Sequence, residues 1–161
     1  MVNLLPYHSF ELITNLSSAE VIEKIIYNTI TKKKLHFKQY KKLFRGIVTE
    51  KGFNISREVN YRNSFKAHIT GEIYTLTEET EVKVTMKLHP FASVFLTLWC
   101  SIVSLAFVII LIAGIYNTKI LLGCFFPLIM LIFGYGLAKL SFNYDARETQ
   151  KILIDILKAK N

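Results

Sequence analysis

The feature that most constrains this chain is an uncharged, strongly apolar run from Phe91 to Tyr116. About 20 such residues in a helix cross the hydrocarbon core of a bilayer, so this run is long enough to span it with some tilt. A second run, Ile120–Leu140, carries one charge, at Lys139. The polar turn at residues 117–119 is short enough to make the two runs an antiparallel hairpin. The alternative is a buried helical pair in a soluble core, but runs this long and uncharged favour a membrane.

Charge is segregated from these runs. The 161 residues contain 20 Lys and Arg against 12 Asp and Glu, which gives a formal charge of +8. Of these basic residues, only Lys119 and Lys139 lie between residues 91 and 140. Because basic flanks stay in the cytoplasm, we expect a multi-pass protein of the cytoplasmic (inner) membrane with both termini cytoplasmic. The first ten residues contain no basic cluster before an apolar core, so we predict no cleaved signal peptide.

Residues 1–90 predict a cytoplasmic α+β domain. Ser17 and Glu20 fit a capping box at the start of a helix whose apolar residues share one face. A short strand is expected at Ser9–Leu12. From Phe44 onward apolar and polar residues alternate in strands that are separated by polar turns. This pattern predicts an antiparallel sheet with one apolar and one polar face, in the order β-α-β-β-β-β.

Residues 141–161 predict an amphipathic helix that packs on the cytoplasmic domain. Asp145 and Glu148 have the spacing of a second capping box, and Leu153 and Leu157 share a helical face. The predicted fold class is therefore an α+β membrane protein. It consists of the sheet with its amphipathic helices, a transmembrane helical hairpin over residues 91–140 (spans 91–116 and 120–140), and this C-terminal helix.

A basic segment with interleaved aromatic residues lies between Thr31 and Arg45 and contains no acidic residue. Beside a membrane, each basic residue contributes ~1 kcal/mol of attraction to anionic lipid. A solvated segment is an equally simple interpretation, and such mixtures also suit nucleic acid. We expect lipid of the anionic inner leaflet rather than nucleic acid as the partner. The candidate lipid contacts are Lys32, Lys33, Lys34, Lys38, Lys41, Lys42 and Arg45.

Arg57 falls on the apolar side of its predicted strand. A guanidinium in that position needs a carboxylate, phosphate or carbonyl partner. It clusters with Tyr61, Arg62 and Asn63 at one turn, so these four residues are candidates for ligand binding or structural pairing. We favour structural pairing, with a carboxylate on a neighbouring strand or a C-terminal carbonyl, over a site for an anionic ligand.

Small and weakly polar residues recur at helical spacing along both apolar runs. In lipid, where apolar burial gives no net drive, small residues allow helix backbones to approach closely. The two stripes therefore face each other or a protein partner, which includes a second copy of the chain. The candidate packing residues are Ser93, Thr97, Ser101, Ser104, Gly123, Gly134 and Ala138.

No pattern in the sequence predicts catalysis, a metal site or a cofactor. The four histidines are scattered without metal-ligand spacing, and Cys100 and Cys124 fall in apolar runs. Nucleophile-elbow, P-loop and dinucleotide-binding glycine motifs are absent from the sequence. We therefore expect neither an enzyme nor a bound metal or cofactor.

The segments YRNSF (Tyr61–Phe65) and MKLHPF (Met86–Phe91), followed by an apolar hairpin, resemble small bacterial two-span membrane proteins of uncharacterised role. The resemblance implies an order of elements and no particular activity. We expect a non-enzymatic integral membrane protein that acts through protein or lipid contacts, as an accessory, regulatory or immunity-type factor. The alternative is a ligand-sensing membrane effector whose sheet domain binds a small anionic ligand and whose hairpin oligomerises.

Overall fold

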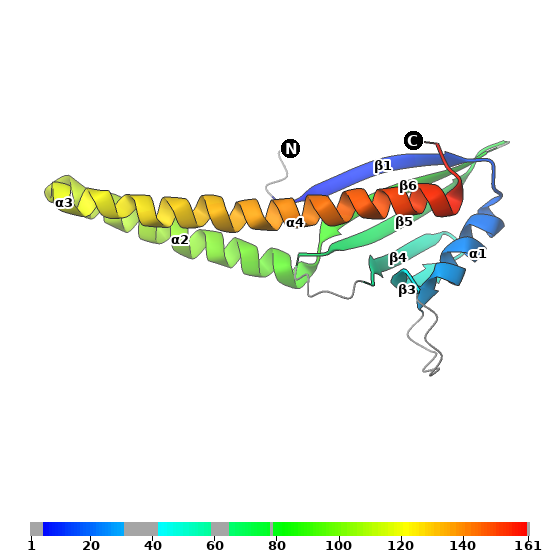
Figure 1. The fold of residues 1–161 in the computed structure, drawn as a ribbon, viewed down its shortest axis with the longest axis horizontal. Coiled ribbons are helices and arrows are strands. Elements are labelled where there is room, and N and C mark those ends of the chain that lie inside the picture. The colour runs from blue at the N-terminus through cyan, green and yellow to red at the C-terminus, as the bar shows by residue number, and fades with distance from the viewer. Residues whose placement is uncertain (1–4, 31–41, 59–64, 78, 161) are drawn as a thin grey trace. The chain divides into compact units, whose positions relative to one another are not determined.

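The chain divides into two compact units. The structure, a computed structural model, describes residues 5–30, 42–58, 65–77 and 79–160. One unit, here called the head, combines Met1–His89 with Phe142–Asn161; the other, the hairpin, is Pro90–Ser141 (Figure 1). The head is therefore assembled from sequence on both sides of the hairpin.

A six-stranded sheet forms the body of the head. Its strands, in spatial order, are β1 (Tyr7–Thr14), β6 (Thr80–Leu88), β5 (Ala67–Thr75), β4 (Gly52–Arg57), β3 (Phe44–Thr49) and β2 (Thr29–Ile30). Figure 1 shows β1, β6, β5 and β4 following one another across the sheet. Neighbouring strands pair antiparallel from β1 to β3, as the alternating sequence predicts.

The prediction of a purely antiparallel sheet is wrong at one edge. Strand β2 pairs parallel with β3, so the sheet is mixed. This strand has only two residues and directly follows the helix α1 (Ser18–Asn28). Two residues are too few to carry a period-two pattern, which is why the sequence gives no sign of β2.

The core lies on one face of the sheet. Val82, Val84 and Met86 of β6 are fully buried, while Lys83 and Lys87 between them are exposed. Helix α1 contributes Val21 and Ile25, also fully buried. The predicted capping box at its start is confirmed, since Glu20 accepts the Ser17 backbone N–H at 2.8 Å and the Ser17 hydroxyl accepts the Glu20 N–H at 3.4 Å.

The hairpin begins with α2 (Pro90–Tyr116), continues through the short α3 (Thr118–Leu121) and the 3-10 turn η1 (Leu122–Cys124), and returns in α4 (Phe125–Leu157). Within it, α2 and α4 meet closely where Gly134 faces Trp99. A Cβ added at Gly134 would lie 3.1 Å from the indole Nε1 of Trp99. In the described part of the chain, two helical stretches are long and apolar enough to cross a membrane, Pro90–Tyr116 and Leu122–Leu157.

The C-terminal helix expected over residues 141–161 is not a separate element. It is the last part of α4, which runs unbroken from Phe125 to Leu157. Phe142 and Ala146 are buried and carry the apolar face onward, and no proline or glycine interrupts the helix near residue 141. Asp145 consequently lies inside the helix and does not cap it, and its carboxylate is available for a tertiary contact.

Candidate functional site

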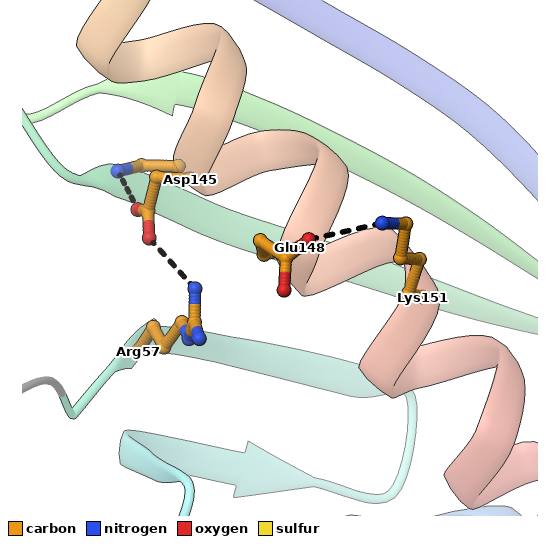
Figure 2. Close-up of polar contacts among 5 residues, drawn as sticks. Arg57, Asp145, Glu148 and Lys151 are labelled. Carbon is orange, nitrogen blue, oxygen red and sulfur yellow. Dashed lines mark hydrogen bonds and ion pairs between the residues drawn. The ribbon is translucent and has the colours of Figure 1, made fainter.

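The buried carboxylate of Asp145 is the centre of a polar site in the described part of the head. Its residue is fully buried, and the carboxylate Oδ2 accepts a hydrogen bond from the backbone N–H of Ala67 at 2.8 Å. The other oxygen, Oδ1, faces the Arg57 guanidinium at 3.5 Å. Figure 2 shows the Asp145 carboxylate pointing toward the Arg57 guanidinium. We call Asp145, Arg57 and the Ala67 amide the carboxylate latch.

The latch joins three segments of the head. Arg57 is the last residue of β4, Ala67 is the first residue of β5, and Asp145 comes from the returning helix α4. A carboxylate removed from water requires a cation or several donors, and the latch supplies both. The Arg57 side chain is 20% exposed and its contact is long, so the short Ala67 hydrogen bond is the better-defined half of the latch.

Further polar contacts fasten the same helix to the sheet and to α1. The Thr14 hydroxyl donates to the Leu157 carbonyl at 2.8 Å, and the Lys24 ammonium donates to the Ile156 carbonyl at 3.1 Å. His8 Nε2 and the Gln150 side-chain oxygen are 2.9 Å apart. The end of α4 is thus held by side chains from β1 and α1 as well as by the latch.

The sequence analysis identified Arg57 as an inward arginine but missed Asp145 as its partner. The signal was present in the spacing, because Asp145, Thr149, Leu153 and Leu157 recur every four residues and share one helical face. A carboxylate on an otherwise apolar face is expected to point inward. Its resemblance to a capping box, with Glu148 three residues later, led to the other interpretation. Glu148 instead pairs with Lys151 at 3.0 Å, as Figure 2 shows.

The other residues of the predicted Arg57 cluster, Tyr61, Arg62 and Asn63, lie outside the described residues. The structure brings Arg57 together with Asp145. Because the latch engages the Arg57 side chain, an anionic ligand at that position would have to compete with a buried carboxylate.

Only two of the candidate lipid contacts, Lys42 and Arg45, lie in the described part of the chain; Lys32, Lys33, Lys34, Lys38 and Lys41 lie outside it. Lys42 donates to the Thr29 carbonyl at 2.9 Å. Arg45 makes a two-pronged contact with Glu58, at 2.9 and 3.0 Å. Both residues thus have partners within the head, and the charge of Arg45 is compensated there.

The candidate packing residues of the hairpin fall into two groups. On α2, Thr97, Ser101 and Ser104 are exposed and Ser93 is half-buried, and the hydroxyls of Thr97 and Ser101 each donate to the carbonyl four residues earlier, at 2.9 Å. On the returning side, Ala138 is buried and Gly134 faces Trp99, while Gly123 is exposed with its nearest neighbour, Ile110 Cγ2, at 3.6 Å. The two stripes are therefore not brought face to face.

Two histidines come together at the end of β6. The rings of His68 and His89 are edge-on, with centroids 6.3 Å apart, and the Ser56 hydroxyl lies 3.4 Å from His68 Nδ1. Burial, and secondarily the charge of His89, holds the pKa of His68 below its ordinary value of 6.5. Among the described residues, no cluster of three or more His, Cys, Asp or Glu is arranged to hold a metal ion.

Fold and site together define an α+β head with a buried carboxylate latch and an apolar helical hairpin inserted between its two segments. Comparisons of this chain with protein-family models, with curated proteins and with solved structures find no match.

Proposed function

We propose that this chain is a non-enzymatic integral membrane protein, anchored in the inner membrane by its hairpin and acting through protein or lipid contacts of its head. Accessory, regulatory and immunity-type roles all fit this description. The observation that carries the proposal is the exposure of the hairpin. In the most apolar windows of the two candidate spans, only 11% and 17% of the residues are buried.

A helix of comparable composition in the core of a soluble protein would be mostly buried, because exposed apolar surface costs roughly 25 cal/mol per Å² in water. Phe91, Ile115 and Leu122 are 77%, 77% and 72% exposed, and large apolar side chains cover the hairpin between them. Lipid is the medium in which such a surface is stable. The hairpin therefore supports the membrane interpretation over the soluble helical pair.

The non-enzymatic part of the proposal is supported by the latch. Asp145 is the fully buried carboxylate of the described head, and both of its oxygens face donors of the chain itself. A group enclosed in this way cannot reach a substrate.

The membrane anchor is tested by alkaline carbonate extraction of native membranes. The wild-type chain should stay with the lipid. Ile102→Arg, in the middle of α2 where the side chain is 65% exposed, should weaken retention because a central charge costs about 3 kcal/mol. Tyr116→Arg at the end of α2 is the matched control and should be retained, since its charge can reach the interface. Release of folded wild-type chain into the carbonate supernatant would overturn the proposal.

The mode of action is tested by mild-detergent affinity purification from native membranes. A stoichiometric protein partner would identify the process in which the chain acts, whereas turnover on a panel of lipids or nucleotides would overturn the non-enzymatic role. The ligand-sensing alternative predicts saturable binding of a small anion that Arg62→Ala weakens, and indifference to that substitution counts against it.

A further inference from the structure

The solvent-facing side of the sheet carries a row of side chains just before β6 ends. Antiparallel register places Tyr7 of β1 opposite Lys87 of β6, and Lys87 opposite His68 of β5. These side chains alternate with buried residues, so they lie on the face opposite the core. His89, whose ring faces His68, follows two residues after Lys87. We call Tyr7, Lys87, His68 and His89 the outer row.

The charge of Lys87 in the outer row is not neutralised in the way that the charge of Lys83, earlier in β6, is neutralised. Lys83 lies on the same face of β6, four residues before Lys87, and pairs with Glu11 at 2.9 Å. For Lys87 the described residues offer no such carboxylate; its ammonium lies 5.9 Å from the centre of the Tyr7 ring. A cation over an aromatic face keeps its charge and is available to an anion.

Among the described residues, the strand neighbours of His68 on this face bring no acidic side chain next to it. Lys87 of β6 and Ser56 of β4 lie on either side of His68. The His89 ring, which follows the C-terminal end of β6, also faces His68. Beyond Ser56, Arg45 of β3 is compensated by Glu58. On β5, the strand that contains His68, the nearest acidic residue on this face is Glu72. Glu72 lies four residues after His68 and opposite Lys83 of β6. The row therefore places the Lys87 ammonium beside the imidazoles of His68 and His89.

We infer that the outer row binds the phosphate of anionic lipid headgroups, and that this contact strengthens as the pH falls. The inference rests on the proposed function, because it needs a bilayer surface at the start of α2. His89 directly precedes Pro90, the first residue of α2, and Lys87 is only three residues from it, within ~10 Å of extended chain. The headgroup region is several ångströms thick on each side, so phosphates and the outer row come within reach of each other.

Proton binding and lipid binding are linked at this row. Burial and the neighbouring His89 disfavour the charged form of His68, whereas an adjacent phosphate favours it. A phosphate that raises the pKa of His68 must bind more tightly to the protonated row, since linkage is reciprocal. The head would then hold the anionic surface more firmly in mildly acidic conditions.

The test uses the full chain in lipid nanodiscs, with the pKa of His68 followed by NMR. In discs of equal parts phosphatidylcholine and phosphatidylglycerol, the pKa of His68 should be higher than in pure phosphatidylcholine by about one pH unit. Lys87→Gln should abolish most of this difference. Lys83→Gln removes one charge from the same strand and face and should leave the difference intact.

Three results would overturn the inference. The first is an equal His68 pKa in the two lipids, and the second is a difference that Lys87→Gln and Lys83→Gln leave equally unchanged, which is the signature of general surface potential alone. The third is a saturable shift on adding inorganic phosphate to phosphatidylcholine discs, which would indicate a site for free anions. If the chain resists carbonate extraction but gives any of these three results, lipid binding by the outer row is refuted while the proposed function is not.

Discussion

At the scale of single residues, Asp145 joins α4 to two strands of the head. Its carboxylate satisfies the Ala67 amide at the start of β5 and faces Arg57 at the end of β4. Those two strand ends flank the connection of residues 58–66, so one side chain of α4 contacts both of its ends. Without the carboxylate, a buried N–H and a largely buried guanidinium would each lose their partner.

Asp145→Ala should lower the free energy of unfolding by about 3 kcal/mol, the sum of an orphaned buried donor and a weakened buried ion pair. Asp145→Asn keeps an acceptor for Ala67 but not the negative charge, so its loss should be smaller. Denaturant unfolding in detergent measures both. Glu58→Gln breaks the half-exposed pair with Arg45 and is the control, with an expected loss of less than about 1 kcal/mol. A loss for Asp145→Ala no larger than the control's would contradict a role for the latch.

Thr149 lies one helical turn after Asp145. Its hydroxyl is fully buried but, unlike the Asp145 carboxylate, lacks a hydrogen-bond partner among the described residues. Thr149→Val replaces that hydroxyl by a methyl group of similar shape and should raise the free energy of unfolding by about 1 kcal/mol. The same unfolding experiment measures the gain, and a loss of stability would mean that the hydroxyl has a partner after all.

His68 gives the head a predictable response to acid. Its pKa in the folded head is held below the ordinary value of 6.5 by burial and by His89, so between the two values the unfolded chain binds more protons than the folded one. The free energy of unfolding should therefore fall as the pH drops through about 6.5 and level off below the folded pKa. Unfolding in neutral detergent at a series of pH values measures this slope. His68→Gln should flatten it, and an unchanged slope would assign the response to other groups.

At the scale of elements, the sequence predicts what depends on local pattern. Period-two alternation predicts the strands β4, β5 and β6, and the capping box and apolar face predict α1. Both signals depend only on residues that are close together in the sequence. The parallel β2 depends instead on its pairing with β3. Asp145 illustrates the limit: its spacing to Glu148 fits a cap, and only the proximity of Ala67 and Arg57 shows that it is an interior residue. Pairings between distant segments leave no local periodicity to read.

The packing of α2 against α4 can be tested at two glycines of one helix. A Cβ at Gly134 would lie 3.1 Å from Trp99 Nε1, whereas a Cβ at Gly136 would have nothing within 4 Å. Gly134→Leu should therefore push the helices apart and lower the melting temperature of the hairpin in detergent. Gly136→Leu should leave it equal or higher, because leucine is the better helix former. If both substitutions act alike, the close approach at Trp99 does not contribute to hairpin stability.

At the scale of the whole molecule, the assembly of the head from two separate segments of the chain restricts how that chain can cross a membrane. The head combines residues before the hairpin with residues after it, joined by contacts such as Thr14 to Leu157 and Ala67 to Asp145. These segments can meet only on one side of a bilayer, so a chain inserted in a membrane must cross it an even number of times. The two candidate spans supply two crossings. This argument from tertiary contacts is independent of the charge count that sets the orientation.

Single-cysteine labelling tests both arguments together. In a chain with Cys100 and Cys124 replaced, Asn117→Cys in the turn should react with a membrane-impermeant maleimide in intact cells. Glu50→Cys and Arg147→Cys, exposed on the two segments of the head, should react only after the membrane is opened, because the proposed orientation places the basic flanks inside. Reaction of the two head positions from opposite sides would contradict an assembled head and with it the even number of crossings. Reaction of both head positions, but not the turn, in intact cells would preserve the crossings and invert the orientation, so the two outcomes separate the contact argument from the charge argument.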